Sequence, residues 1–137
     1  MRYTLLDGWR DELLLLARIL LVILFVLFGY FKLTDFHGTI AEMTGAGLPI
    51  PTAAAAVVVI LEFFVGIAIL LGFFTRPLAL LLAVYTLAAA FIGHHYWNMT
   101  GGAHMANMIN FYKNVSIVGG FLLLCLTGPG KYSIDRK

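Results

Sequence analysis

Four long apolar segments alternate with shorter polar connections along the chain. They cover residues 13–30, 52–74, 77–93 and 111–127. A helix needs about 20 mainly apolar residues to cross the hydrocarbon core of a bilayer. Proline and glycine residues separate the segments, at positions where they begin or end helices. The pattern therefore predicts an all-α integral membrane protein, in which a bundle of four transmembrane helices forms one domain over residues 1–137.

The amino-acid composition supports a membrane location. Apolar residues make up 61% of the chain and charged residues 12%, whereas a typical soluble domain is about 45–50% apolar and about 25% charged. These proportions exclude an ordinary soluble enzyme, a disordered chain and a secreted disulfide scaffold. The net charge of +2 gives no reason to expect a nucleic-acid partner, and one cysteine cannot form an internal disulfide. The first apolar segment is longer than that of a signal peptide and contains Arg18, so cleavage is not expected.

The distribution of lysine and arginine predicts the orientation of the bundle. Most basic residues lie at the chain ends or in the turn between the second and third segments: Arg2, Arg10, Arg76, Lys131, Arg136 and Lys137. Lys32 and Lys113 fall on the other side. Short basic connections stay in the cytoplasm, so both termini are expected to be cytoplasmic. The connections 31–51 and 94–110 then face outward, and a short helix is expected near residues 39–43.

Glu62 is an acidic residue near the middle of the second apolar segment. Placing an acid there costs about 2.5–3.5 kcal/mol, so its carboxyl group needs a partner or a proton. Arg18 in the first segment is the expected partner, because extended side chains would span the roughly 10 Å difference in depth between the two residues. Tyr85 and Thr86 lie at intermediate depth, and the Tyr85 hydroxyl is expected to support the pair. Two interpretations remain open, a structural pair that fixes helix packing and a functional proton acceptor.

Further polar residues lie on the predicted outer side. Lys32 and Lys113 are expected to anchor their helices at the headgroups, or alternatively to bind an anionic headgroup or a substrate carbonyl. Asn114 follows Lys113 at the start of the fourth segment. All four histidines also fall on this side: His37, His94, His95 and His104. Their spacing matches no usual ligand pattern, so neither a metal site nor a haem is expected.

Several short motifs follow one another along most of the chain. They are Arg18 with Gly29-Tyr30-Phe31-Lys32-Leu33, Glu62 with Gly66, Leu71-Gly72-Phe73-Phe74-Thr75-Arg76, Lys113-Asn114, and Gly128-Pro129-Gly130-Lys131-Tyr132-Ser133-Ile134-Asp135-Arg136. In this order and spacing they resemble the DoxX family of small four-span bacterial inner-membrane proteins, and among them the YqjF-type group. The resemblance implies a four-helix fold and an inner-membrane location.

The resemblance also implies a role in redox biology. The family takes its name from a subunit of a thiosulfate-oxidising, quinone-reducing membrane complex, and most members have no established activity. We therefore expect an accessory subunit of a quinone-linked membrane redox system. No cofactor is expected within the chain, quinone is the expected ligand, and the expected partners are the bilayer, a redox subunit and further copies of the chain. The alternative is a non-catalytic scaffold that stabilises a redox or stress-response complex.

The candidate residues for this role are polar residues in or beside the membrane segments. The family has no agreed catalytic residues, so these candidates come from the reasoning above and from the family's recurrent polar positions. They are Glu62, Arg18 and Tyr85 for catalysis, and Lys32, Lys113 and Asn114 for contact with a ligand or headgroup. No metal ligand is proposed.

Overall fold

The computed structural model describes residues 5–136, which fold into helices and connecting turns without a β-strand. The elements, in chain order, are η1 (Asp7–Trp9), α1 (Arg10–Thr34), α2 (Phe36–Gly45), α3 (Pro51–Val59), η2 (Ile60–Val65), α4 (Gly66–Leu70), α5 (Thr75–Gly93), η3 (Tyr96–Asn98) and α6 (Gly101–Thr127). Within these residues, four helical segments are long and apolar enough to cross a membrane. The predicted all-α bundle of four transmembrane helices is confirmed.

The helix boundaries follow local sequence but differ in places from the apolar pattern. Helix α1 extends beyond residues 13–30 at both ends, from Arg10 to Thr34. The second span is one continuous helix, Pro51–Leu70, and it ends four residues before the predicted position 74. Gly72 and Phe74 both take left-handed backbone conformations there, with φ +72° and +47°, and this turn stops the helix. The fourth helix begins at Gly101. The apolar pattern placed its start at residue 111, because the first turns of the helix are more polar and lie outside the apolar run.

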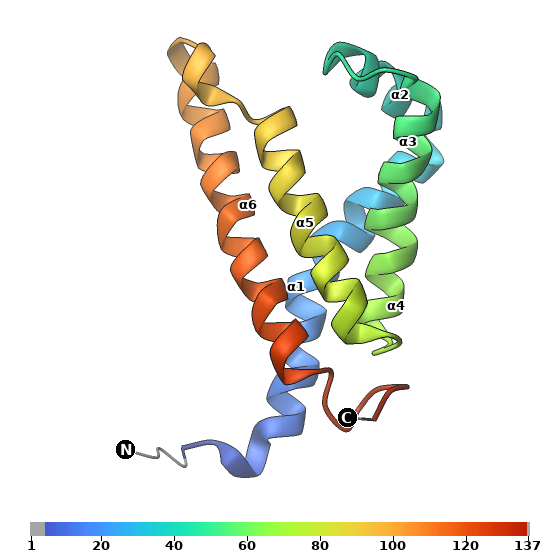
Figure 1. Ribbon diagram of the computed structural model, residues 1–137, viewed down its shortest axis with the longest axis vertical. Helices are drawn as coiled ribbons and strands as arrows, with labels where there is room; N and C mark the ends of the chain where they lie inside the picture. Colours follow the sequence, from blue (N-terminus) through green and yellow to red (C-terminus); the bar gives the residue numbers. More distant parts are fainter. Residues whose placement is uncertain (1–4, 137) are drawn as a thin grey trace.

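The helices pack as two groups that meet at one end of the bundle. Helix α5 packs along α6, while α1 packs against η2 and α4. The shared core contains Val22 and Phe25 of α1, Leu82 of α5 and Phe121 of α6. The rings of Phe25 and Phe121 meet edge to face at 5.3 Å. Beyond this core the two groups diverge, so that α2 and α3 stand apart from the upper parts of α5 and α6 (Figure 1).

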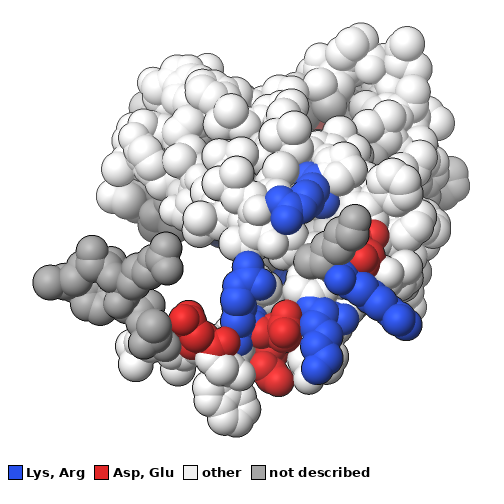
Figure 2. All heavy atoms as spheres, turned by 60° about the horizontal axis from the view of Figure 1, so that its bottom comes forward, with Lys and Arg blue, Asp and Glu red and all other residues white. Residues whose placement is uncertain are grey.

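We call the two ends of the bundle the closed end and the open end. The closed end holds the start of α1, the turn at residues 71–74 and the C-terminal segment 128–136, and the open end holds α2 and η3. The start of α1 and the end of α6 both lie at the closed end, as an even number of spans requires (Figure 1). Lysine, arginine and acidic side chains are interspersed on this end, on an otherwise uncharged surface (Figure 2). That this end faces the cytoplasm stays a prediction from charge.

The C-terminal segment folds back onto the closed end and is held there by hydrogen bonds. Arg18 donates to the carbonyl oxygens of Leu70 at 3.2 Å, Pro129 at 2.6 Å and Tyr132 at 2.6 Å. Its side chain is fully buried. Because a buried guanidinium needs acceptors for its donors, Arg18 ties α1 to both the end of α4 and the C-terminal segment.

Asp135 fixes the same segment to the start of α5. Its carboxylate accepts hydrogen bonds from the backbone N–H groups of Phe74 at 3.0 Å and Thr75 at 2.9 Å, which caps the helix. Partial burial of the carboxyl raises the pKa of Asp135, but these two donors and the charge of Arg18 outweigh burial and lower the pKa below its ordinary 3.8. The ionised form of Asp135 is therefore the one that holds the C-terminal segment.

Candidate functional site

Glu62 lies in a widened turn in the middle of the second span. The helix changes from α to π geometry over Ile60–Val65 and returns to α geometry at Gly66. A π turn accommodates one extra residue, which shifts the helix faces by about 100°. Such turns occur often at functional sites. Here the turn places a largely buried carboxylate, 12% exposed, between α1 and α5.

The partner of Glu62 is Lys32 of α1. The Lys32 Nζ atom lies 2.9 Å from both carboxylate oxygens of Glu62, and the lysine side chain is 23% exposed. Gly29, one turn before Lys32, makes this approach possible. A Cβ atom at Gly29 would lie only 2.6 Å from the backbone nitrogen of Phe63, so the two backbones touch. This close contact between α1 and η2 places the Lys32 ammonium group beside the Glu62 carboxylate.

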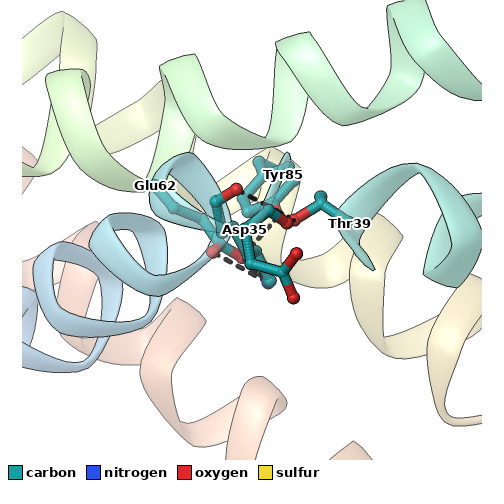
Figure 3. Close-up of polar contacts among 5 residues, drawn as sticks. Asp35, Thr39, Glu62 and Tyr85 are labelled. Carbon is teal, nitrogen blue, oxygen red and sulfur yellow. Dashed lines mark hydrogen bonds and ion pairs between the residues drawn. The ribbon is translucent and has the colours of Figure 1, made fainter. Parts of the chain in front are cut away.

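Tyr85 of α5 completes the cluster. Its hydroxyl donates to Oε1 of Glu62 at 2.8 Å, as the close-up shows (Figure 3). The sequence prediction that Tyr85 supports Glu62 is confirmed. The carboxylate thus receives donors from two different transmembrane helices, and the cluster joins the α1 group to the α5–α6 group.

The start of α2 is hydrogen-bonded to the end of α1 next to Lys32. The Thr39 hydroxyl donates to the carbonyl oxygens of Lys32 and Asp35, both at 3.0 Å. The Asp35 carboxylate in turn accepts from the backbone N–H of Gly38 at 3.1 Å and caps α2. The end of α1 and the start of α2 are therefore locked together next to the ion pair.

The cluster lines a cavity that lies between the two helix groups. The cavity has a volume of about 700 Å³, within the usual range of roughly 300–1,000 Å³ for small-molecule sites. Apolar side chains such as Phe25, Phe28, Phe31, Met43 and Ile92 form much of its wall. Its polar lining includes the Lys32–Glu62 ion pair and Tyr85. Charged or polar side chains also line it at Asp35, Glu42, Thr86, Lys113 and Asn114.

The predicted pair between Arg18 and Glu62 is wrong. Arg18 lies at the closed end and uses its donors on backbone carbonyls, as described above. The depths of Arg18 and Glu62 along their helices allowed the pair. Depth does not show that the C-terminal segment folds back and supplies the acceptors of Arg18. Lys32 was expected either to anchor its helix at the headgroups or to bind an anionic headgroup or a substrate carbonyl, and its ammonium group pairs with Glu62. The sequence signal for this was Gly29, which lies on the same face of α1 and marks a close helix contact.

Lys113 and Asn114 line the cavity from α6. Lys113 is exposed, and its ammonium group lies 3.3 Å from Oδ1 of Asn110. Asn114 is half-buried. The structure therefore brings the two α6 candidates to the same cavity as Lys32, Glu62 and Tyr85, and it leaves Arg18 outside.

The histidines at residues 94–104 bond to neighbouring side chains and backbone. His94 contacts Asn107 at 2.9 Å, His95 contacts Asn98 at 2.7 Å, and His104 contacts the carbonyl oxygen of Tyr96 at 2.9 Å. Over residues 5–136, no group of three or more histidine, cysteine or acidic side chains is arranged to hold a metal ion.

Comparison with known proteins places these features in a family. The model of the DoxX family matches residues 13–95. Inner membrane protein YphA of Escherichia coli strain K12 is 53% identical over this whole chain and 98% of its own length. Inner membrane protein YqjF of the same strain is 46% identical over 93% of this chain and 92% of its own length. A Surfeit locus protein 4 homolog of Schizosaccharomyces pombe is 34% identical over half of this chain and 24% of its own length. No solved structure matches.

Proposed function

The chain belongs to the DoxX family and is an integral inner-membrane protein, and on this premise we propose that it is an accessory subunit of a membrane redox system that binds a quinone in the cavity. The observation on which the proposal rests is that the Lys32–Glu62–Tyr85 cluster lines the cavity and is not sealed in the core. A polar cluster that only fixed helix packing would not need an adjacent ligand-sized space.

The residues of the cavity fit a quinone. The aromatic and aliphatic wall suits a flat apolar ring, and the volume of about 700 Å³ is sufficient for one. The Lys32 ammonium has a third N–H donor beyond the two directed at Glu62, and the Tyr85 hydroxyl can turn from Glu62 to a ligand carbonyl oxygen. The location between transmembrane helices also suits a ligand whose long apolar chain stays in the bilayer.

Each residue of the cluster has a defined chemical task in this proposal. When bound, a quinone supplies reversible transfer of two electrons together with two protons. Lys32 orients the ring by donating to a carbonyl, and its ammonium group also pairs with the Glu62 carboxylate. Glu62 accepts a proton in that state, and the Tyr85 hydroxyl, 2.8 Å away, passes the proton between the carboxylate and the cavity. The electron donor belongs to a partner subunit.

The experiment measures quinone binding to the purified protein in lipid nanodiscs. Decyl-1,4-benzoquinone is titrated, and quenching of tryptophan fluorescence and the quantity of bound quinone are recorded. We expect saturable binding that weakens about tenfold in Lys32→Met and in Tyr85→Phe, since each loses a donor to the ring. Lys131→Met, which alters an exposed lysine at the closed end, is the matched control and should bind normally. Absence of saturable binding would refute the proposal.

The structure also offers an observation in favour of the scaffold alternative. The Glu62 carboxylate already has donors from Lys32 and Tyr85 within the chain, so the cluster is complete without a ligand. A scaffold predicts that one stoichiometric partner protein co-purifies without quinone. It also predicts that Tyr85→Phe leaves the amount of that partner unchanged while the quinone proposal predicts weaker ligand binding in the same variant.

A further inference from the structure

Thr86 is a buried residue on the α5 side of the cavity whose hydroxyl has no hydrogen-bond partner. Its side chain is 2% exposed, and it lines the cavity beside Tyr85. An unpartnered buried hydroxyl is uncommon because it loses its hydrogen bonds to water without replacement. We therefore expect a bound ligand to supply the missing hydrogen-bond partner of Thr86 in the functional state.

Three other helical threonines bond to their own helix, and Thr75, at the start of α5 and outside the cavity, is the second buried threonine whose hydroxyl has no partner among residues 5–136. Thr34, Thr39 and Thr44 each donate to the carbonyl oxygen four residues earlier, at 2.9–3.0 Å. Thr86 is also inside a helix and has the same local option, but its hydroxyl does not take it.

The charges around the cavity restrict what this hydroxyl can bind. Asp35, Glu42 and Glu62 are acidic, and Lys32 and Lys113 are basic. Since Glu62 is paired with Lys32, the two remaining acids face one remaining lysine. A phosphate or carboxylate headgroup would meet repulsion here, whereas an uncharged carbonyl oxygen would not.

We infer that Thr86, together with the half-buried amide of Asn114, forms a second polar contact for a neutral ligand that has two acceptor oxygens on one flat ring. The first contact is Lys32 and Tyr85. The two contacts select a ring with two carbonyls, a 1,4-dioxo ring with an apolar chain, over a ring with one. The inference rests on the proposed quinone function and adds a specificity-determining residue to it.

The test compares two ligands in nanodiscs by equilibrium dialysis. Decyl-1,4-benzoquinone has two ring carbonyls, and 4-decylacetophenone has one acceptor oxygen. Thr86→Val removes the hydroxyl with little change in shape and should weaken quinone binding about fivefold, the equivalent of one hydrogen bond. It should leave acetophenone binding unchanged, and Thr86→Ser should restore quinone binding. Thr75→Val, which alters a buried threonine at the start of the same helix outside the cavity, should bind both ligands normally.

A stability measurement separates ligand recognition from a structural role. Without ligand, Thr86→Val should unfold at the same temperature as the unsubstituted protein or higher, because the hydroxyl has no partner to lose. Lower stability, or equal weakening of both ligands, would overturn the inference. Quinone binding that Thr86→Val leaves unchanged would overturn it while the proposed function stands. Failure of the unsubstituted protein to bind quinone would overturn both.

Discussion

Removing both charges of the Lys32–Glu62 pair should destabilise the protein no more than removing either one. Lys32→Met leaves a carboxylate that is 12% exposed with only the Tyr85 hydroxyl as donor. Glu62→Gln leaves an ammonium group beside a neutral amide, which still accepts from Tyr85. The double variant leaves no unpaired charge in the membrane interior. The three variants together measure how strongly the two charges depend on each other.

The burial of the pair sets the expected magnitudes. Breaking a buried ion pair from one side costs about 3–5 kcal/mol. Because the lysine side chain is 23% exposed and the cavity is adjacent, we expect the lower end of that range. The free energy of unfolding should fall by about 3 kcal/mol in Lys32→Met, about 2 kcal/mol in Glu62→Gln and about 2 kcal/mol in the double variant. The implied coupling energy is about 3 kcal/mol.

Unfolding by sodium dodecyl sulfate in mixed micelles, followed by circular dichroism, measures these differences. Lys113→Met is the control, because Lys113 lines the same cavity but is exposed, and its stability should change by less than about 0.5 kcal/mol. Additive effects of the two single substitutions, with a coupling energy under about 0.5 kcal/mol, would show that the pair does not hold α1 and η2 together.

Three further predictions concern the closed end and the helix contacts. Arg18→Lys should lower the free energy of unfolding by about 3 kcal/mol and make the C-terminal segment sensitive to trypsin, because a lysine cannot reach all three carbonyls. A lysine at the exposed Arg10 should have neither effect. An Arg18→Lys protein that stays stable and resistant to trypsin would contradict this prediction. Gly29→Ala should cost about 2 kcal/mol through contact with the adjacent backbone, and Gly119→Ala, with open space around it, should gain about 0.5 kcal/mol in the same micelle assay. Since the folded-state pKa of Asp135 is lowered, its contribution to stability is present above about pH 4 and is lost as the pH falls through the lower, folded-state value. Thermal unfolding between pH 2 and pH 6 should show this loss, and Asp135→Asn should lack it.

The sequence predicted part of the site as well as the fold. Glu62 was identified as the polar centre and Tyr85 as its support, because an acid within an apolar helix needs donors at its own depth. The ion-pair partner was predicted wrongly as Arg18. Depth along a single helix is a local quantity, and it does not tell which face of one helix meets another. The π turn around Glu62 was also outside the reach of the sequence, since the apolar run continues through it unchanged.

The amino-acid sequence alone is enough to predict the number of membrane helices and the presence of an acid that needs a partner. Both follow from the free energy of placing each side chain in hydrocarbon, which depends on residue type and position along one segment. The packing of the helices is needed to see that Lys32 meets Glu62, that Arg18 binds the C-terminal segment, and that a cavity lies beside the pair. These depend on contacts between residues far apart in the chain, such as the touching backbones at Gly29 and Phe63, which no single segment specifies.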